Sequence, residues 1–339
     1  MMSTRLVLFC TVALAIGTPT WAVATDALTI TPDCTGPRLS LEGADHFYWI
    51  EPSGDRIVLD RACGPVGADC DHDVLVVWDA DGRKLVEIAP LLDMAEMSAG
   101  TTFDATLRTR DRLVVSAVVG GVPLLLAEYD VRSGDLLRTA STGSIECVDV
   151  HADHDGTTWC VGVDLARRRD GEDYDLVYRF DASGTAEAST LPRSTYPPDV
   201  DRLVAAGPRH TGGGGFLPGD GDIRLWLPAV GELVSFDDEG HVSDRLVLPE
   251  IDDAQRARLV SAPGDEIFAM FTVGRDDAGD EWRQALYRLA GDGSAWEPLT
   301  GSADTLPMRF DLVGADEAGL ILLDRSSLTL CHLRIPAGD

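Results

Sequence analysis

Val76-Val-Trp-Asp79-Ala-Asp-Gly82 decides the fold, because the chain repeats this pattern about every fifty residues. Each copy is an apolar strand that runs into an Asp/Gly turn, and a second strand such as Lys84–Ile88 follows. Asp-Gly and Ser-Gly tolerate the positive φ that tight hairpin turns require. The later copies are Ala127–Gly134, Tyr178–Gly184, Val234–Gly240, a weaker Tyr287–Gly293 and a half copy, Cys331–Arg334.

Another hairpin precedes each copy, so the repeating unit is four antiparallel strands. Units of this kind at a period of roughly 40 to 55 residues are typical of propeller blades. We therefore predict an all-β fold, a six-bladed β-propeller of four-stranded antiparallel blades. The predicted blades cover residues 46–88, 103–140, 145–190, 201–248, 257–299 and 308–335.

The last predicted unit is one strand short. Residues 308–314, 320–324 and 328–335 supply three strands, and the strand-like Ala27–Thr31 has no other partner. An unpaired blade edge would leave backbone donors and acceptors exposed. We expect this N-terminal strand to complete the last blade and close the ring.

The first 24 residues have the composition of a secretory signal peptide. Arg5 precedes the apolar run Leu6–Ile16, and Ala22-Val-Ala24 is a small-x-small cleavage site. We expect a signal peptide at 1–24, a single propeller domain at 25–339, and a periplasmic or secreted protein. No later stretch reaches about 18 uninterrupted apolar residues, so we expect no membrane insertion.

Six cysteines remain after residue 24, and an even number in an exported protein predicts disulfides rather than a zinc site. Ring closure would place Cys34 and Cys331 in one blade, where a bridge would stabilise the fold by about 5 kcal/mol in the chain-entropy treatment. Cys147 and Cys160 flank a predicted turn symmetrically. Cys63 and Cys70 would staple an inserted loop.

The first unit, residues 54–60 followed by 74–88, resembles the NHL-type blades of exported six-bladed propellers. Such blades contain a turn, a short strand that ends in Asp, a loop, and then an apolar-aromatic-Asp-x-x-Gly segment. The resemblance weakens in the last two units. It implies a fold and no activity, because propellers host unrelated functions.

The charge balance excludes some partners. Lys and Arg total 28 against 57 Asp and Glu, a net charge of −29. Such a chain repels phosphate backbones, so we expect no nucleic-acid partner.

No motif predicts a catalytic residue, a cofactor or a metal centre. Ala152–Trp159 is similar to a degenerate sialidase Asp-box, which is a structural turn in any case. Asp149, Asp153 and Asp155 could bind a cation weakly, but Gly162 stands where an EF-hand needs its bidentate acid. A gluconolactonase-like central cation would need an Asn ligand, and the sequence has no Asn.

Long loops of a propeller gather on one rim, and here they contain the scarce arginines. Arg and Tyr are favoured in binding surfaces. We therefore predict a monomeric, non-catalytic binding or scaffold module for a protein or glycan partner. The alternative is a hydrolase, lactonase or quinoprotein dehydrogenase with its site in the central channel. The predicted binding residues are Arg61, Arg167, Arg168, Arg169, Arg193, Tyr196, Arg275 and Arg325.

Overall fold

The computed structural model describes residues 32–36, 38, 46–53, 56–62, 74–79, 83–88, 100–109, 111–119, 122–197, 215–217, 223–228, 230–251, 256–275, 282–299, 306–316 and 319–335. The predicted signal peptide 1–24, the predicted strand Ala27–Thr31 and the predicted Cys63–Cys70 disulfide lie outside these residues.

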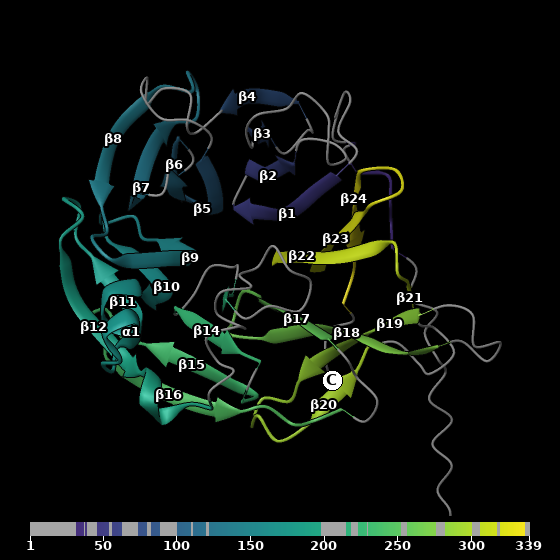
Figure 1. Ribbon diagram of the computed structural model, residues 1–339. Coiled ribbons are helices and arrows are strands. Elements are labelled where there is room, and N and C mark those ends of the chain that lie inside the picture. Colours follow the sequence, from purple (N-terminus) through teal and green to yellow (C-terminus); the bar gives the residue numbers. More distant parts are fainter. Residues whose placement is uncertain are drawn as a thin grey trace, which may run out of the picture.

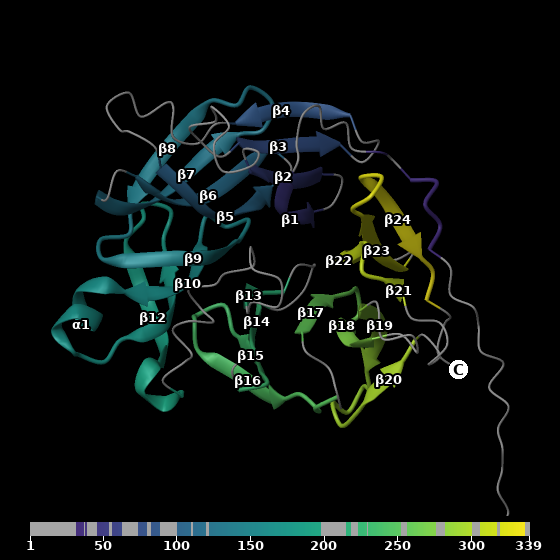
Figure 2. The same cartoon turned by 45° about the vertical axis from the view of Figure 1, so that its right-hand side comes forward.

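The described strands form antiparallel sheets arranged in a ring, with the first strand of each sheet innermost (Figures 1 and 2). Five of these sheets have four or more strands, which confirms a propeller of four-stranded blades. The first sheet contains β1 (His46–Ser53), β2 (Arg56–Ala62), β3 (Val74–Asp79) and β4 (Lys84–Ile88), and the second contains β5 (Gly100–Thr109), β6 (Arg112–Val119), β7 (Val122–Asp130) and β8 (Leu136–Ser141). The third sheet contains β9 (Ile145–Ala152), β10 (Thr158–Asp164), β11 (Asp175–Phe180) and β12 (Ala186–Pro192), and the fourth contains β13 (Gly215–Phe216), β14 (Arg224–Leu227), β15 (Glu232–Phe236) and β16 (Val242–Val247). The fifth contains β17 (Arg256–Ser261), β18 (Ile267–Arg275), β19 (Trp282–Leu289) and β20 (Trp296–Pro298), and β19 also pairs with β21 (Leu306–Pro307).

A further sheet has three strands among the described residues: β22 (Phe310–Asp316), β23 (Gly319–Asp324) and β24 (Thr329–Leu333). Its apolar face packs against the first sheet, where Val313 and Leu323 share a core with Trp78. On its other side, Leu312 and Leu322 share a core with residues of β17–β19. The last sheet therefore contacts both the preceding sheet and the first one.

The aspartate of the repeated pattern organises the turn between the third and fourth strands. Asp130 Oδ1 accepts the backbone N–H groups of Arg132 and Ser133. Asp181 and Asp237 likewise accept backbone N–H groups from residues of their own turns. Each such carboxylate satisfies turn donors that no strand partner could reach. These backbone hydrogen bonds hold the pKa values of Asp130 and Asp237 below their usual range. The pKa of Asp181 is lowered first by the Ser183 hydroxyl and then by the backbone N–H of Thr185.

The glycine of each described turn lies against the outer strand of the preceding sheet. A Cβ at Gly184, where φ is 84°, would lie 2.1 Å from Cβ of Ala140 on β8. A Cβ at Gly293 would lie 2.8 Å from Leu246 on β16. The positive φ favours glycine at both positions, and at Gly184 the close approach of Ala140 leaves no room for a side chain.

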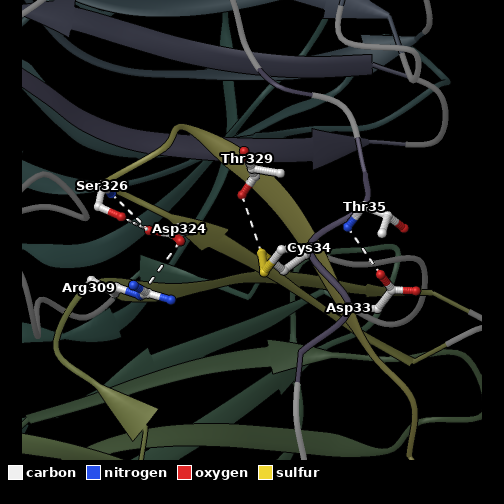
Figure 3. The surroundings of a disulfide bond; sticks show 8 residues. Asp33, Cys34, Thr35, Arg309, Asp324, Ser326 and Thr329 are labelled. Carbon is white, nitrogen blue, oxygen red and sulfur yellow. Dashed lines mark hydrogen bonds and ion pairs between the residues drawn. A yellow bond between two sulfur atoms is a disulfide. The ribbon is translucent and has the colours of Figure 1, made fainter.

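The segment that precedes the first sheet runs along the edge of β24 (Figure 3). Asp33 and His332 exchange two backbone hydrogen bonds, of 2.8 and 2.9 Å between N and O, and Arg38 forms an isolated bridge with Thr329. The predicted disulfide between Cys34 and Cys331 is present here, and it joins residues 297 apart in sequence. The predicted Cys147–Cys160 disulfide is also present, between β9 and β10.

The described helices are short. They are α1 (Leu165–Asp170), between β10 and β11, and the 3-10 turn η1 (Arg193–Thr195), which follows β12. No helix in the described ranges is long and apolar enough to cross a membrane.

Candidate functional site

Three of the predicted binding residues lie on one helix at the rim. In an antiparallel four-stranded sheet, the connection between the second and third strands lies at the same end as the connection to the next sheet. α1 occupies the first of these connections and carries Arg167, Arg168 and Arg169, whose side chains are exposed. The Arg168 guanidinium makes no hydrogen bond or ion pair within the described part of the chain, while its carbonyl accepts the Gly171 backbone N–H that ends the helix.

Both ends of α1 are capped by its own sequence. Asp164 precedes the helix and accepts the backbone N–H groups of Ala166 and Arg167. Gly171 follows it at φ 74°, the left-handed conformation that commonly ends helices. The caps satisfy backbone groups that would otherwise be orphaned and fix the helix on the sheet, although only six residues are helical.

Asp173 joins the α1 connection to the η1 connection. Its carboxylate accepts the backbone N–H of Ser194 at 2.9 Å and the Ser194 hydroxyl at 2.5 Å. Its carbonyl accepts from Arg167 Nη1 at 3.3 Å. The Ser194 hydroxyl is the main cause that lowers the pKa of Asp173. We call residues 165–173 and 193–195 together the α1 surface.

Two predicted residues from the η1 connection have different environments. Arg193 is a half-buried member of this surface, and its backbone N–H donates to the Tyr174 carbonyl. Tyr196 is buried, and its hydroxyl bonds Arg245 Nη1 at 2.9 Å. Tyr196 therefore packs inside the molecule, and it anchors the connection instead of presenting a binding surface.

The other predicted residues lie on other sheets. Arg61 is in β2 and Arg275 is in β18, and their side chains are outside the described atoms. Arg325 follows β23 and forms a two-pronged ion pair with Asp311. Figures 1 and 2 place α1 and β23 on opposite sides of the ring. The structure thus gathers Arg167, Arg168, Arg169 and Arg193, and it does not bring Arg325 to them.

A pocket of about 300 Å³ opens next to α1 on the sheet β9–β12. We call it the Tyr178 pocket. Its described lining residues are Ile145, Asp164, Arg167, Asp175, Tyr178, Ala186, Glu187, Ala188 and Ser189. Arg167 therefore belongs both to this pocket and to the α1 surface.

Tyr178 has a hydroxyl group without a hydrogen-bond partner. The side chain is buried, with 6% of the residue exposed, and it lies opposite Ser189 on β12 and the disulfide-bonded Cys160 on β10. Burial, together with the carboxylates of Asp164 and Asp175, raises the pKa of the hydroxyl well above its usual value. The phenol is therefore neutral at physiological pH, and it can both donate and accept a hydrogen bond.

The carboxylates of the pocket retain free acceptor capacity. Asp164 uses Oδ1 for the helix cap and for the Ser144 hydroxyl, while its Oδ2 lies 3.8 Å from Arg167 Nε. Asp175 accepts one hydrogen bond, from the Ser189 hydroxyl at 2.5 Å. Each carboxylate offers about four lone-pair sites.

Sequence reasoning missed this pocket because Tyr178 stands at the apolar first position of a repeat copy. That position predicts a core residue, and Tyr178 is indeed buried. The sequence signal that could have revealed the pocket was the tyrosine hydroxyl, because three other copies have an apolar residue at this position: Val76, Ala127 and Val234. A buried tyrosine normally finds a partner for its hydroxyl.

The Asp-box-like segment is a structural turn, as the sequence indicates. The Asp153 carboxylate accepts the Trp159 indole N–H at 2.8 Å, and Asp155 accepts the Thr157 backbone N–H at 2.7 Å. The Asp149 carboxylate accepts the Phe216 backbone N–H at 2.9 Å and thereby links β9 to β13. No group of three or more metal-ligating side chains occurs among the residues that the structure describes.

No protein-family model and no curated protein sequence matches this chain. The structure is similar to that of a duf4221-family member from Bacteroides vulgatus, with a TM-score of 0.52 and 8% identity over 92% of this chain and 100% of that one. A protein of unknown function from Bacteroides caccae gives a TM-score of 0.45 and 13% identity over 78% and 85% of the two chains. Virginiamycin B lyase from Staphylococcus aureus gives a TM-score of 0.44 and 9% identity over 88% of this chain and 98% of that one. At such identities the first likeness indicates a shared fold alone, and the two lower scores support no inference.

Proposed function

We propose that the protein is a non-catalytic binding propeller that recognises a protein or glycan partner through the α1 surface. The observation that carries this proposal is the capped helix α1, which holds three consecutive exposed arginines on a protein of net charge −29. Guanidinium groups bind carboxylates and other planar anions through paired hydrogen bonds. The partner is therefore one that presents anionic groups.

Order in the α1 surface supports this role. The hydrogen bonds of Asp173 hold the two connections together before any partner arrives. A preformed surface loses less conformational entropy on binding than a free loop does. The Arg168 guanidinium, which lacks an intramolecular hydrogen bond or ion pair within the described residues, is available for intermolecular contacts.

The test is a capture experiment with the tagged protein and an extract of its source organism. The variant R167A/R168A/R169A should lose the specifically captured partner, with at least a tenfold weaker affinity when that partner is purified. The matched control R83A/K84A/R132A removes the same charge from the β3–β4 and β7–β8 hairpins at the other end of the sheets, and it should bind as the wild type does. Equal binding by both triple variants would refute the proposal.

Export is part of the proposal. Disulfides persist in oxidising compartments, and the chain contains Cys34–Cys331 and Cys147–Cys160. We infer a monomer that is periplasmic or secreted after removal of a signal peptide at 1–24. The partner is accordingly a molecule of that compartment.

We also propose that the ring has six NHL-like blades and that the N-terminal segment completes the last one. The backbone pairing of Asp33 with His332 supports this arrangement, as does the Cys34–Cys331 disulfide. The added strand would cover the edge of β24, which would otherwise expose unpaired backbone groups.

A further inference from the structure

We propose that the Tyr178 pocket binds small organic molecules that carry a primary ammonium group. This site is distinct from the proposed partner-binding role of the α1 surface, although Arg167 contributes to both. The inference comes from the acceptors that line the pocket, from its charge, and from the unpartnered hydroxyl of Tyr178.

The acceptors match the donors of an ammonium group in number. A primary ammonium has three N–H donors and no acceptor. Asp164 Oδ2, the Asp175 carboxylate and the Tyr178 hydroxyl oxygen each retain acceptor capacity. A buried hydroxyl without a partner is destabilising, and a hydrogen bond from a ligand donor would recover part of that cost.

The lining charge favours a cation over an anion. Asp164, Asp175 and Glu187 provide three carboxylates against the single guanidinium of Arg167 among the described lining residues. Glu187 is neutralised by Arg179, whose Nη1 lies 2.6 Å from its carboxylate. Asp164 and Asp175 together outweigh Arg167, which lies 3.8 Å from Asp164, so the potential at Tyr178 is negative. Both carboxylates add to burial in raising the pKa of Tyr178.

The phenol and the apolar lining favour an organic cation over a metal ion. Ca²⁺ takes carboxylate, carbonyl and water oxygens, and a neutral phenol adds little to such a set. Ile145, Ala186 and Ala188 also line the pocket and suit the carbon skeleton of an organic amine. A volume of about 300 Å³ lies at the small end of ligand pockets, so the ligand is small.

Isothermal titration calorimetry with the purified full chain tests the ligand class. The probes are benzylamine, its neutral analogue benzyl alcohol, the anion benzoate, and CaCl₂. Benzylamine should bind saturably with one site per chain, and the other three should give no saturable heat. Saturable binding of benzyl alcohol, benzoate or Ca²⁺ at the strength of benzylamine, or no benzylamine binding at all, would overturn the proposal.

Two variants place the binding in this pocket. Y178F keeps the ring and removes the hydroxyl, and it should weaken benzylamine binding at least tenfold. D175N should weaken it further, because it removes a charge. The controls Y287F and D244N make the same changes on other sheets and should bind as the wild type does; thermal melts verify that all four variants fold.

Unchanged benzylamine affinity in both Y178F and D175N would overturn the proposal. Calorimetry uses no macromolecular partner, so failure here leaves the capture experiment on the α1 surface intact. Conversely, the R168A/R169A variant, which keeps Arg167, should lose partner affinity and retain its affinity for benzylamine. Loss of both activities in that variant would contradict the separation of the two sites.

Discussion

Arg108 shows how a single side chain can fasten two sheets together. It extends from the inner strand β5 to the turn between β9 and β10, and 5% of the residue is exposed. Its guanidinium donates to the carbonyls of Asp153 and Thr157 at 2.6 and 2.7 Å and to the Thr158 hydroxyl at 2.6 Å. Glu128 lies 3.5 Å from Arg108 Nε and neutralises its charge. The Asp-box-like turn is thus held from the neighbouring sheet.

Replacing Arg108 should destabilise the fold strongly. Arg108→Ala removes the three hydrogen bonds of a buried guanidinium, and a hydrogen bond to a charged group is typically worth about 1.5–3 kcal/mol. Glu128 keeps its ion pair with Arg138. Urea unfolding measures the loss. The control Arg132→Ala removes an exposed ion pair with Asp111 and should change the free energy of unfolding by less than about 1 kcal/mol. Equal effects of the two substitutions would contradict the role assigned to Arg108.

The sequence predicted the roles of some individual residues and not those of others. The turn aspartates could be predicted, because Asp beside Gly repeats at a fixed place and its local hydrogen bonds depend only on nearby backbone. Arg108 could not, because its acceptors lie 45 to 50 residues away and no repeat marks it. The buried position of Tyr196 was missed for a related reason, since its partner Arg245 belongs to the next sheet.

At the scale of elements, the turns between third and fourth strands are the recurring device. Each aspartate accepts backbone N–H groups in its own turn, so folding depends on the charged form of the side chain. Because their folded-state pKa values are lowered, these carboxylates contribute stability above the unfolded value of about 3.9. That contribution is lost as the pH falls through the folded-state pKa.

The triple variant D130N/D181N/D237N should therefore lose less thermal stability than the wild type between pH 6 and pH 3, although it melts at a lower temperature at pH 6. Thermal melts monitored by circular dichroism measure this difference. The control D135N/D238N/D244N changes three exposed aspartates whose carboxylates accept no hydrogen bond from the described residues. It should follow the wild-type pH dependence. Identical pH profiles for the two triple variants would show that the turn carboxylates do not carry this stability.

Strands and turns were predictable from the sequence, whereas α1 was not. The alternation of apolar residues and the Asp/Gly turns place the sheets close to their observed bounds. Leu165–Asp170 has no amphipathic period, and only its flanking Asp164 and Gly171 indicate a helix. Of the predicted rim residues, the arginines of one long connection lie together on α1, while Arg325 binds Asp311 on another sheet.

For the whole molecule, the disulfide between Cys34 and Cys331 links the two ends of the described chain. The chain-entropy treatment assigns a bridge over 297 residues about 5–6 kcal/mol, and the Cys147–Cys160 bridge over 13 residues about 3 kcal/mol. C34A/C331A should therefore lower the free energy of unfolding by about 3 kcal/mol more than C147A/C160A does. Denaturant unfolding compares the two variants. A larger loss in C147A/C160A would contradict this ranking.

The number of blades illustrates the limit of prediction at this scale. Repeat spacing predicted six units, and the described residues form five sheets of four or more strands and one of three. Repeat spacing counts hairpins within one stretch of chain. A pairing between distant segments, such as that of Asp33 with His332, leaves no repeat signature.

The contact between each turn glycine and the outer strand before it limits how such a protein can evolve by shuffling its units. Gly134, Gly184 and Gly293 sit over Val86, Ala140 and Leu246 respectively, so the surface that receives the turn differs in size from one junction to the next. A unit transplanted to another place would meet a neighbour shaped for a different turn. Duplication or exchange of whole units therefore has to be accompanied by changes on the outer strand next to it, and the repeats are free to diverge only in adjoining pairs.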